Sequence, residues 1–223
     1  MRAHFRWGCL LMDWMFTLSG FVVGAIVGLT GVGGGSLMTP LLVLVFGIHP
    51  ATAVGTDLLY AAITKAGGTF VHAKKDHVDW RITRLLAAGS IPAALLTIWA
   101  LSFLPKQSDE VSHVISVSLG IALLLTAGAI IFRHKLQNHA LAHADDSAHT
   151  QLRAPITITV GALLGVLVTV SSVGAGALGV AVLFYLYPRL PTIRIIGSDL
   201  AHAVPLTLVA GLGHWLLGSI DWS

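Results

Sequence analysis

The glycine-rich stretch GLTGVGGGS, residues 28–36, lies between two apolar runs and decides how this chain can fold. Residues 14–30 lead into it, and residues 36–48 follow it without a charged side chain. No Gly-Lys-Ser or Gly-Lys-Thr follows, so the stretch does not match a nucleotide-binding P-loop. Glycines break helices, and broken backbone inside a bilayer is tolerated only where it is buried in protein or lines a cavity. We therefore expect a half-length or re-entrant helix after this stretch.

The composition of the whole chain is that of a membrane protein. Of its 223 residues, 55% are apolar and 10% are charged, whereas a soluble domain carries about 25% charged residues. This balance excludes an ordinary soluble enzyme, a disordered chain and a nucleic-acid binder. We expect an all-α polytopic membrane protein with apolar segments at 14–30, 36–48, 52–72, 84–104, 111–132, 155–172, 174–187 and 196–218.

The second half of the chain repeats the first. A shift of 141 residues places Gly33 on Gly174 and Gly35 on Gly176, and a shift of 142 places Asp57 on Asp199. We predict a first repeat half at 1–132, a polar cytoplasmic linker at 133–154 and a second half at 155–223 that stops before its last two spans. Such repeats are typical of secondary transporters, which bind their substrate at the repeat interface.

Positive charges predict the orientation of the spans. The loop 73–84 and the linker are rich in Lys and Arg, so the positive-inside rule places both in the cytoplasm. Arg2 and Arg6 place the N-terminus in the cytoplasm as well. In this arrangement Arg189 and Arg194 lie on the outer side.

The paired glycine clusters are candidate anion sites. A helix that begins at such a break presents free N–H groups and a partial positive charge, and Ser36 is expected to cap the helix after the first break. The alternative is close helix packing, which we favour for Gly20, Gly24 and Gly28.

Charged residues inside the predicted spans are the other candidates. Asp57 follows Thr56 and Asp199 follows Ser198, so both carboxylates fit either helix capping or handling of a proton or substrate. Lys65 needs a bound anion or a fixed carboxylate partner. His202 is a candidate proton carrier.

Further polar residues have structural explanations. Asp79-Trp80 and Asp221-Trp222 are expected to cap helices and anchor them at the interface, where we also expect His72 and His214. His139 and His143 could hold a metal ion, but we favour a solvated linker as the explanation for them.

The glycine stretch with Pro40, the sequence ATAVGTD at 51–57 and the sequence VDWR at 78–81 resemble the sulfite exporter TauE/SafE family. The resemblance implies a bacterial inner-membrane protein of about eight spans that moves sulfite or other small sulfur-containing or organic anions. It carries over onto Gly33, Gly34, Gly35 and Ser36, and onto Gly174 and Gly176.

We therefore predict a secondary transporter for a small anion, without catalytic residues, metal or cofactor. Its expected partners are the anion and the bilayer, with a second copy of the chain as a further candidate and no nucleic acid. The alternatives are a metal-cation transporter or partner subunit using Asp57, Asp199 and histidines, and an intramembrane enzyme. The predicted substrate-binding residues are Gly33, Gly34, Gly35, Ser36, Thr56, Asp57, Lys65, Gly174, Gly176, Ser198, Asp199 and His202.

Overall fold

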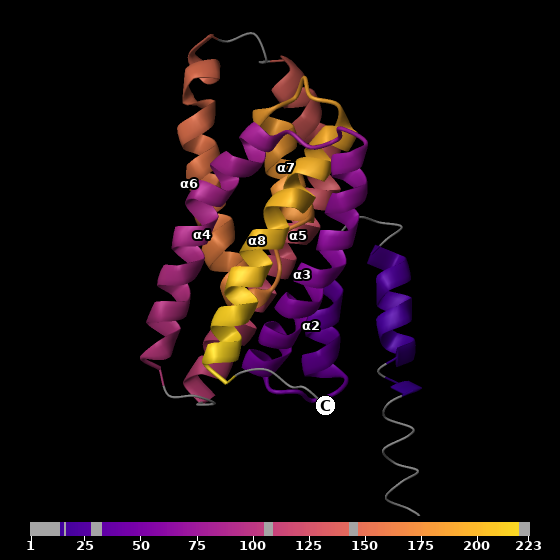
Figure 1. Ribbon diagram of the computed structural model, residues 1–223, viewed down its shortest axis with the longest axis vertical. Helices are drawn as coiled ribbons and strands as arrows, with labels where there is room; N and C mark the ends of the chain where they lie inside the picture. The colour runs from indigo at the N-terminus through magenta and orange to yellow at the C-terminus, as the bar shows by residue number, and fades with distance from the viewer. Residues whose placement is uncertain (1–13, 16, 28–32, 105–108, 143–146, 219–223) are drawn as a thin grey trace, which may run out of the picture.

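The computed structural model describes residues 14–15, 17–27, 33–104, 109–142 and 147–218, and within these ranges it is helical without a strand (Figure 1). Four described segments are long and apolar enough to cross a membrane: Trp80–Ser102, Glu110–Phe132, Arg153–Ser171 and Thr192–Leu216. The predicted all-α membrane architecture is confirmed. After a first helix at Thr17–Val27, the helices are α2 (Gly35–Leu44), α3 (Pro50–Lys74), α4 (Trp80–Ser102), α5 (Asp109–Ala142), α6 (Ser147–Ser171), α7 (Ala177–Leu186) and α8 (Thr192–Leu216).

The helices that follow the two glycine clusters are short, as predicted. Both α2 and α7 have 10 residues, which is about 15 Å of helix and half of the hydrocarbon thickness. Each precedes a helix of 25 residues, α3 or α8. The matched lengths fit the expected duplication, which stays a prediction.

Helices α3 and α8 pack side by side and run in opposite directions (Figure 1). A Cβ on Gly68 would lie 2.8 Å from the Leu200 side chain, and a Cβ on Gly211 would lie 2.7 Å from that of Leu59. Because glycine has no side chain, the neighbouring leucines can fill these positions. The contact brings the charged residues of α3 next to those of α8.

Helices α4 and α6 approach each other through glycines of α6. A Cβ on Gly161 would overlap the Leu86 carbonyl, and a Cβ on Gly165 would overlap the Ser90 carbonyl. The two backbones are therefore in direct contact, as in small-residue seams between membrane helices. Gly20 and Gly24, which match these glycines in the predicted repeat, have open space around them. The packing expected for Gly20 and Gly24 is not observed, and Gly28 lies outside the described residues.

The aspartate before α4 caps that helix, as predicted. Oδ1 of Asp79 accepts hydrogen bonds from the N–H groups of Arg81 at 3.0 Å and Ile82 at 3.2 Å. Trp80 is 54% exposed, which fits an interfacial anchor. Asp221 and Trp222 lie outside the described residues.

Much of the predicted polar linker belongs to helices. Helix α5 continues to Ala142 and α6 begins at Ser147, so residues 133–142 and 147–154 extend the two helices beyond their apolar parts. The side chains of His139 and His143 lie outside the described residues. The domain boundaries at this linker stay a prediction.

Arginines from separate segments gather at one end of the bundle. Arg81, Arg153 and Arg189 line a common cavity, and Arg194 lies 3.5 Å from Asp76 in an ion pair. The expectation that Arg189 and Arg194 lie on the side opposite the loop 73–84 is therefore wrong. It failed because α6 and α7 together return the chain to the end at which α6 begins (Figure 1).

The first helix starts at the other end of the bundle. In Figure 1 the helix Thr17–Val27 rises from the lower end, while the loop between α3 and α4 lies at the upper end. The start of the first helix and the arginine-rich end therefore face opposite sides of the membrane. The two predictions that place both of them in the cytoplasm exclude each other.

Candidate functional site

The two glycine breaks, 141 residues apart in the sequence, meet inside the bundle. A Cβ on Gly33 would lie 3.1 Å from the carbonyl oxygen of Ala175 and 3.6 Å from Cα of Gly176. A Cβ on Gly35 would overlap the carbonyl oxygen of Ser172. The backbone before α2 is thus in contact with the backbone between α6 and α7.

Backbone conformation requires glycine at this junction. Gly33 has a φ of 95° and Gly176 a φ of 141°, values that side-chain-bearing residues rarely adopt. Gly176 is also the N-cap residue of α7. Replacing either residue would strain the backbone at the point where the two breaks touch.

Both short helices begin at this junction without a side-chain cap. Gly34 and Gly176 occupy the N-cap positions of α2 and α7. The expected capping by Ser36 is wrong: Ser36 lies within the first turn, and its hydroxyl donates to the Gly33 carbonyl at 2.7 Å. The first amides of a helix have no partner within it, so these two N-termini can offer N–H groups to a bound anion.

Lys65 reaches the junction from α3. Its ammonium donates a hydrogen bond of 2.8 Å to the carbonyl oxygen of Ala175, in the segment between α6 and α7. It also interacts electrostatically with Asp57 and Asp199. The structure thus brings the predicted cation to the predicted glycine break, 110 residues away in the sequence.

Asp57 connects three parts of the molecule. Its Oδ2 accepts a hydrogen bond of 2.7 Å from Thr39 in α2 and another of 2.7 Å from Ser172 after α6. The side chain is buried. Asp57 does not cap α3, which begins at Pro50, so the expected capping role is wrong, and its role in handling a proton or substrate stays a prediction. The carboxylate connects α2, α3 and the second break.

Asp199, the predicted repeat partner of Asp57, has a different environment. It is equally buried and lies against Gly179 of α7, where a Cβ would overlap its Oδ1. Among the described residues this oxygen has no hydrogen-bond partner. A buried carboxylate oxygen in that state is available to a ligand, a proton or a cation.

The three other predicted residues lie on α3 and α8. Thr56 is half-buried next to Asp57 on α3. Ser198 accepts a hydrogen bond of 2.7 Å from the Asp79 N–H and donates one of 2.7 Å to the Arg194 carbonyl, so it attaches α8 to the start of α4. His202 is fully buried, and its Nε2 lies 2.8 Å from the Ser90 hydroxyl of α4.

His214 does not lie at the interface as expected. Its side chain is 2% exposed, and Nε2 lies 2.9 Å from the Thr169 carbonyl oxygen. The position near the end of a span suggested headgroup contact, but the adjacent α6 covers the ring.

Sequence reasoning missed the partners of Asp57. Ser172 belongs to the second glycine cluster, and its hydroxyl is a sequence feature that could have indicated a polar contact. No sequence feature singles out Thr39, because its hydroxyl bonds to a carboxylate 18 residues away, across a turn between two helices.

Sequence comparisons connect the chain to known membrane proteins. The chain matches the family described as sulfite exporter TauE/SafE over residues 16–223. It is 38% identical over 205 residues to the probable membrane transporter protein YjnA of Bacillus subtilis, covering 92% of this chain and 80% of the relative. It is 30% identical over 210 residues to a probable membrane transporter protein of Xylella fastidiosa, covering 92% and 75%. No solved structure matches the chain.

The fold and the matched relatives define the class of protein: this chain is a multi-pass helical membrane protein of the transporter type. More specifically, the chain belongs to the sulfite exporter TauE/SafE family.

Proposed function

We propose that this protein is a secondary transporter that moves a small anion, such as sulfite or an organosulfonate, across the bacterial inner membrane. The observation that supports the proposal most strongly is the meeting of the two glycine breaks with Lys65 at their junction. The halves 1–132 and 155–223 then form the two sides of the site, joined through residues 133–154.

The charges at the junction suit an anion. Each helix N-terminus carries roughly half an elementary positive charge, so α2 and α7 add to the ammonium of Lys65. An anion bound there would accept hydrogen bonds from backbone N–H groups and from Lys65. The substrate-contacting residues that we propose are Gly33, Gly34, Gly35, Ser36, Lys65, Gly174 and Gly176.

The two aspartates play different parts in this proposal. Asp57 is engaged by two hydroxyls and keeps the junction assembled. Asp199 has an oxygen without a partner among the described residues and faces α7, so we assign the binding of a coupling ion to it. Thr56 lies next to Asp57 on α3, and His202 lies one turn after Asp199 on α8.

The distribution of arginines supports one orientation. Because Arg81, Arg153, Arg189 and Arg194 lie at the same end as Lys74, we place that end in the cytoplasm. The start of the helix Thr17–Val27 then faces the opposite side.

The proposed alternatives gain less support. Among the described residues, no three His, Cys, Asp or Glu side chains gather in a way that could hold a metal ion. The matched relatives are named transporters rather than enzymes.

Flux measurements with labelled sulfite in proteoliposomes test the proposal. Lys65→Met removes the cation and is expected to lower the initial rate about tenfold or more, since a charge-assisted hydrogen bond contributes about 1.5–3 kcal/mol. Lys74→Met, at the end of the same helix, is the matched control and should retain the wild-type rate. Equal rates in wild type and Lys65→Met would overturn the assignment of the site.

Adjacent glycines provide a second matched pair. A Cβ on Gly35 would overlap the Ser172 carbonyl, whereas Gly34 has open space and a helical φ of −59°. Gly35→Ala should therefore abolish flux by separating the two breaks, and Gly34→Ala should leave most of it. The reverse order would contradict the proposed contact.

A further inference from the structure

A cavity at the arginine-rich end of the bundle is separate from the junction of the glycine breaks. Its volume is about 530 Å³, within the range of about 300–1,000 Å³ usual for small-molecule sites. It is bounded by the first turns of α4, by α6 and by the loop from α7 to α8, and it is lined by Asp79, Arg81, Ile82, Leu85, Arg153, Ala154, Tyr187, Arg189 and Leu190.

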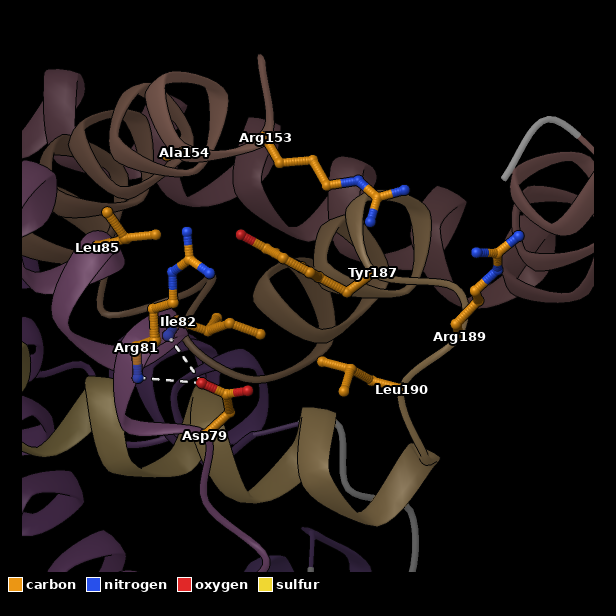
Figure 2. Close-up of a pocket in the computed structure, with 9 residues that line it drawn as sticks. All are labelled: Asp79, Arg81, Ile82, Leu85, Arg153, Ala154, Tyr187, Arg189 and Leu190. Carbon is orange, nitrogen blue, oxygen red and sulfur yellow. Dashed lines mark hydrogen bonds between the residues drawn. The ribbon is translucent and has the colours of Figure 1, made fainter. Parts of the chain in front are cut away.

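Cationic side chains from different segments line this cavity. Figure 2 shows the hydroxyl of Tyr187 directed toward the guanidinium group of Arg81, while the side chain of Arg153 extends past Tyr187 toward the side where Arg189 lies. The Tyr187 hydroxyl lies 2.8 Å from that of Thr157 in α6, which fixes its position. Two guanidinium groups on one cavity repel each other, so an anion bound in the cavity would relieve an unfavourable charge arrangement.

The carboxylate that lines the cavity does not neutralise it. Asp79 uses Oδ1 to cap α4 through the backbone N–H groups of Arg81 and Ile82 (Figure 2). Among the described lining residues, this carboxylate stands against the guanidinium groups of Arg81 and Arg153. The cavity therefore has a net positive charge.

The apolar residues in and near the cavity suit a ligand that is partly apolar. Ile82, Leu85 and Leu190 form part of its lining, and Ile156, one turn along α6 from Arg153, is 39% exposed. Trp80, next to Asp79, is 54% exposed, which indicates the level of the headgroups. Basic pockets between membrane helices on the cytoplasmic side suit anionic headgroups.

The geometry points to a binding site for a phosphate group in this cavity, with Arg81 and Arg153 as its cationic lining, at the end of the bundle that carries the arginines. The planar guanidinium fork matches phosphate oxygens, and Tyr187 can donate a further hydrogen bond. The phosphate belongs either to an anionic phospholipid or to a soluble phosphate.

Thermal unfolding of the purified protein tests this site. Wild type is measured in detergent containing phosphatidylcholine, in the same detergent with phosphatidylglycerol, and with inorganic phosphate against chloride at equal ionic strength. Stabilisation by phosphatidylglycerol alone identifies a lipid headgroup, and stabilisation by phosphate as well identifies a site that accepts the free anion. No response to either compound would overturn the proposal.

Variants separate the cavity from general surface charge. Arg81→Gln with Arg153→Gln removes two guanidinium groups that line the cavity, and Lys75→Gln with Arg84→Gln removes two exposed charges near the same end that do not line it. We expect the first pair to weaken the apparent affinity for the stabilising compound about tenfold per arginine, and the second pair to leave it nearly unchanged. Equal losses in the two double variants would overturn the proposal.

A direct count of bound lipid tests the site even in variants that fold poorly. Native mass spectrometry of the folded fraction should show phosphatidylglycerol retained by wild type and by the surface variant, and lost from Arg153→Gln alone. Arg153→Lys, which keeps the charge but not the planar fork, should retain part of it. Full retention of lipid in Arg153→Gln would contradict the assignment.

Discussion

Asp57 and Asp199 occupy matching positions in the predicted repeat, but their surroundings differ. Both side chains are 3% exposed. Asp57 accepts hydrogen bonds from Thr39 and Ser172, whereas Oδ1 of Asp199 has no partner among the described residues. One carboxylate is engaged in structure, and the other is available for binding.

The sequence explains this difference once the contacts are known. A shift of 141 residues places Val180 where Thr39 stands, and Gly31 where Ser172 stands. The sequence positions that would correspond to Thr39 and Ser172 around Asp199 therefore carry no hydroxyl. Two aspartates that match in the predicted repeat therefore have different hydrogen-bond partners.

The largest effect is expected from removing the charge of the available carboxylate. Asp199→Asn should lower sulfite flux in proteoliposomes about tenfold or more, because the coupling ion loses a charged ligand. The midpoint of thermal unfolding should stay close to wild type, since Oδ1 has no partner to lose. A strongly destabilised variant would show that Asp199 is structural like Asp57.

The second-largest effect is expected on the free energy of unfolding, when the carboxylate of Asp57 is removed. Asp57→Ala leaves the hydroxyls of Thr39 and Ser172 without their acceptor, and hydrogen bonds between membrane helices contribute about 0.6–1.7 kcal/mol each. We expect the free energy of unfolding in detergent to fall by about 1–3 kcal/mol. If Asp57→Ala keeps wild-type stability and loses only flux, the two aspartates have the same role.

Removing one of the two hydroxyls should have about half of that effect. Thr39→Val deletes the donor from α2 and leaves the bond from Ser172 in place, so the unfolding free energy should fall by about 0.6–1.7 kcal/mol. Thr64→Val is a control on α3, because its hydroxyl bonds only to the backbone of its own helix. A larger loss in the control than in Thr39→Val would contradict the role of this contact.

The smallest effect comes from making the second half resemble the first. Val180→Thr places a hydroxyl near Asp199 if the repeat alignment holds, and we expect a gain of stability of about 0.6 kcal/mol with a reduced flux. Unfolding and flux are measured on the same preparation. Unchanged values in both assays would indicate that residue 180 does not face Asp199.

Local patterns predicted the parts of this structure that depend on local physics. The glycine clusters predicted two short helices, and the Asp79-Trp80 pair predicted a capped helix start, because breaks and caps involve neighbouring residues. The rarity of cations inside spans identified Lys65 as a residue with a partner.

Contacts between distant segments were not predictable in the same way. The hydrogen bond from Ser172 to Asp57 spans 115 residues, and that from Lys65 to Ala175 spans 110. The placement of Arg189 failed for a related reason, since span counting could not show that α6 and α7 reverse the chain. The glycine pair Gly20 and Gly24 has the spacing of a packing motif but no neighbour within 4 Å of an added Cβ.

Calorimetric titration of sulfite into the purified protein tests most directly whether the junction of the two breaks holds an anion. Wild type should bind sulfite with saturation, and Lys65→Gln should show at least about tenfold weaker binding. Titration with zinc under the same conditions should give no comparable signal. Saturable zinc binding together with equal sulfite affinity in wild type and Lys65→Gln would contradict the account.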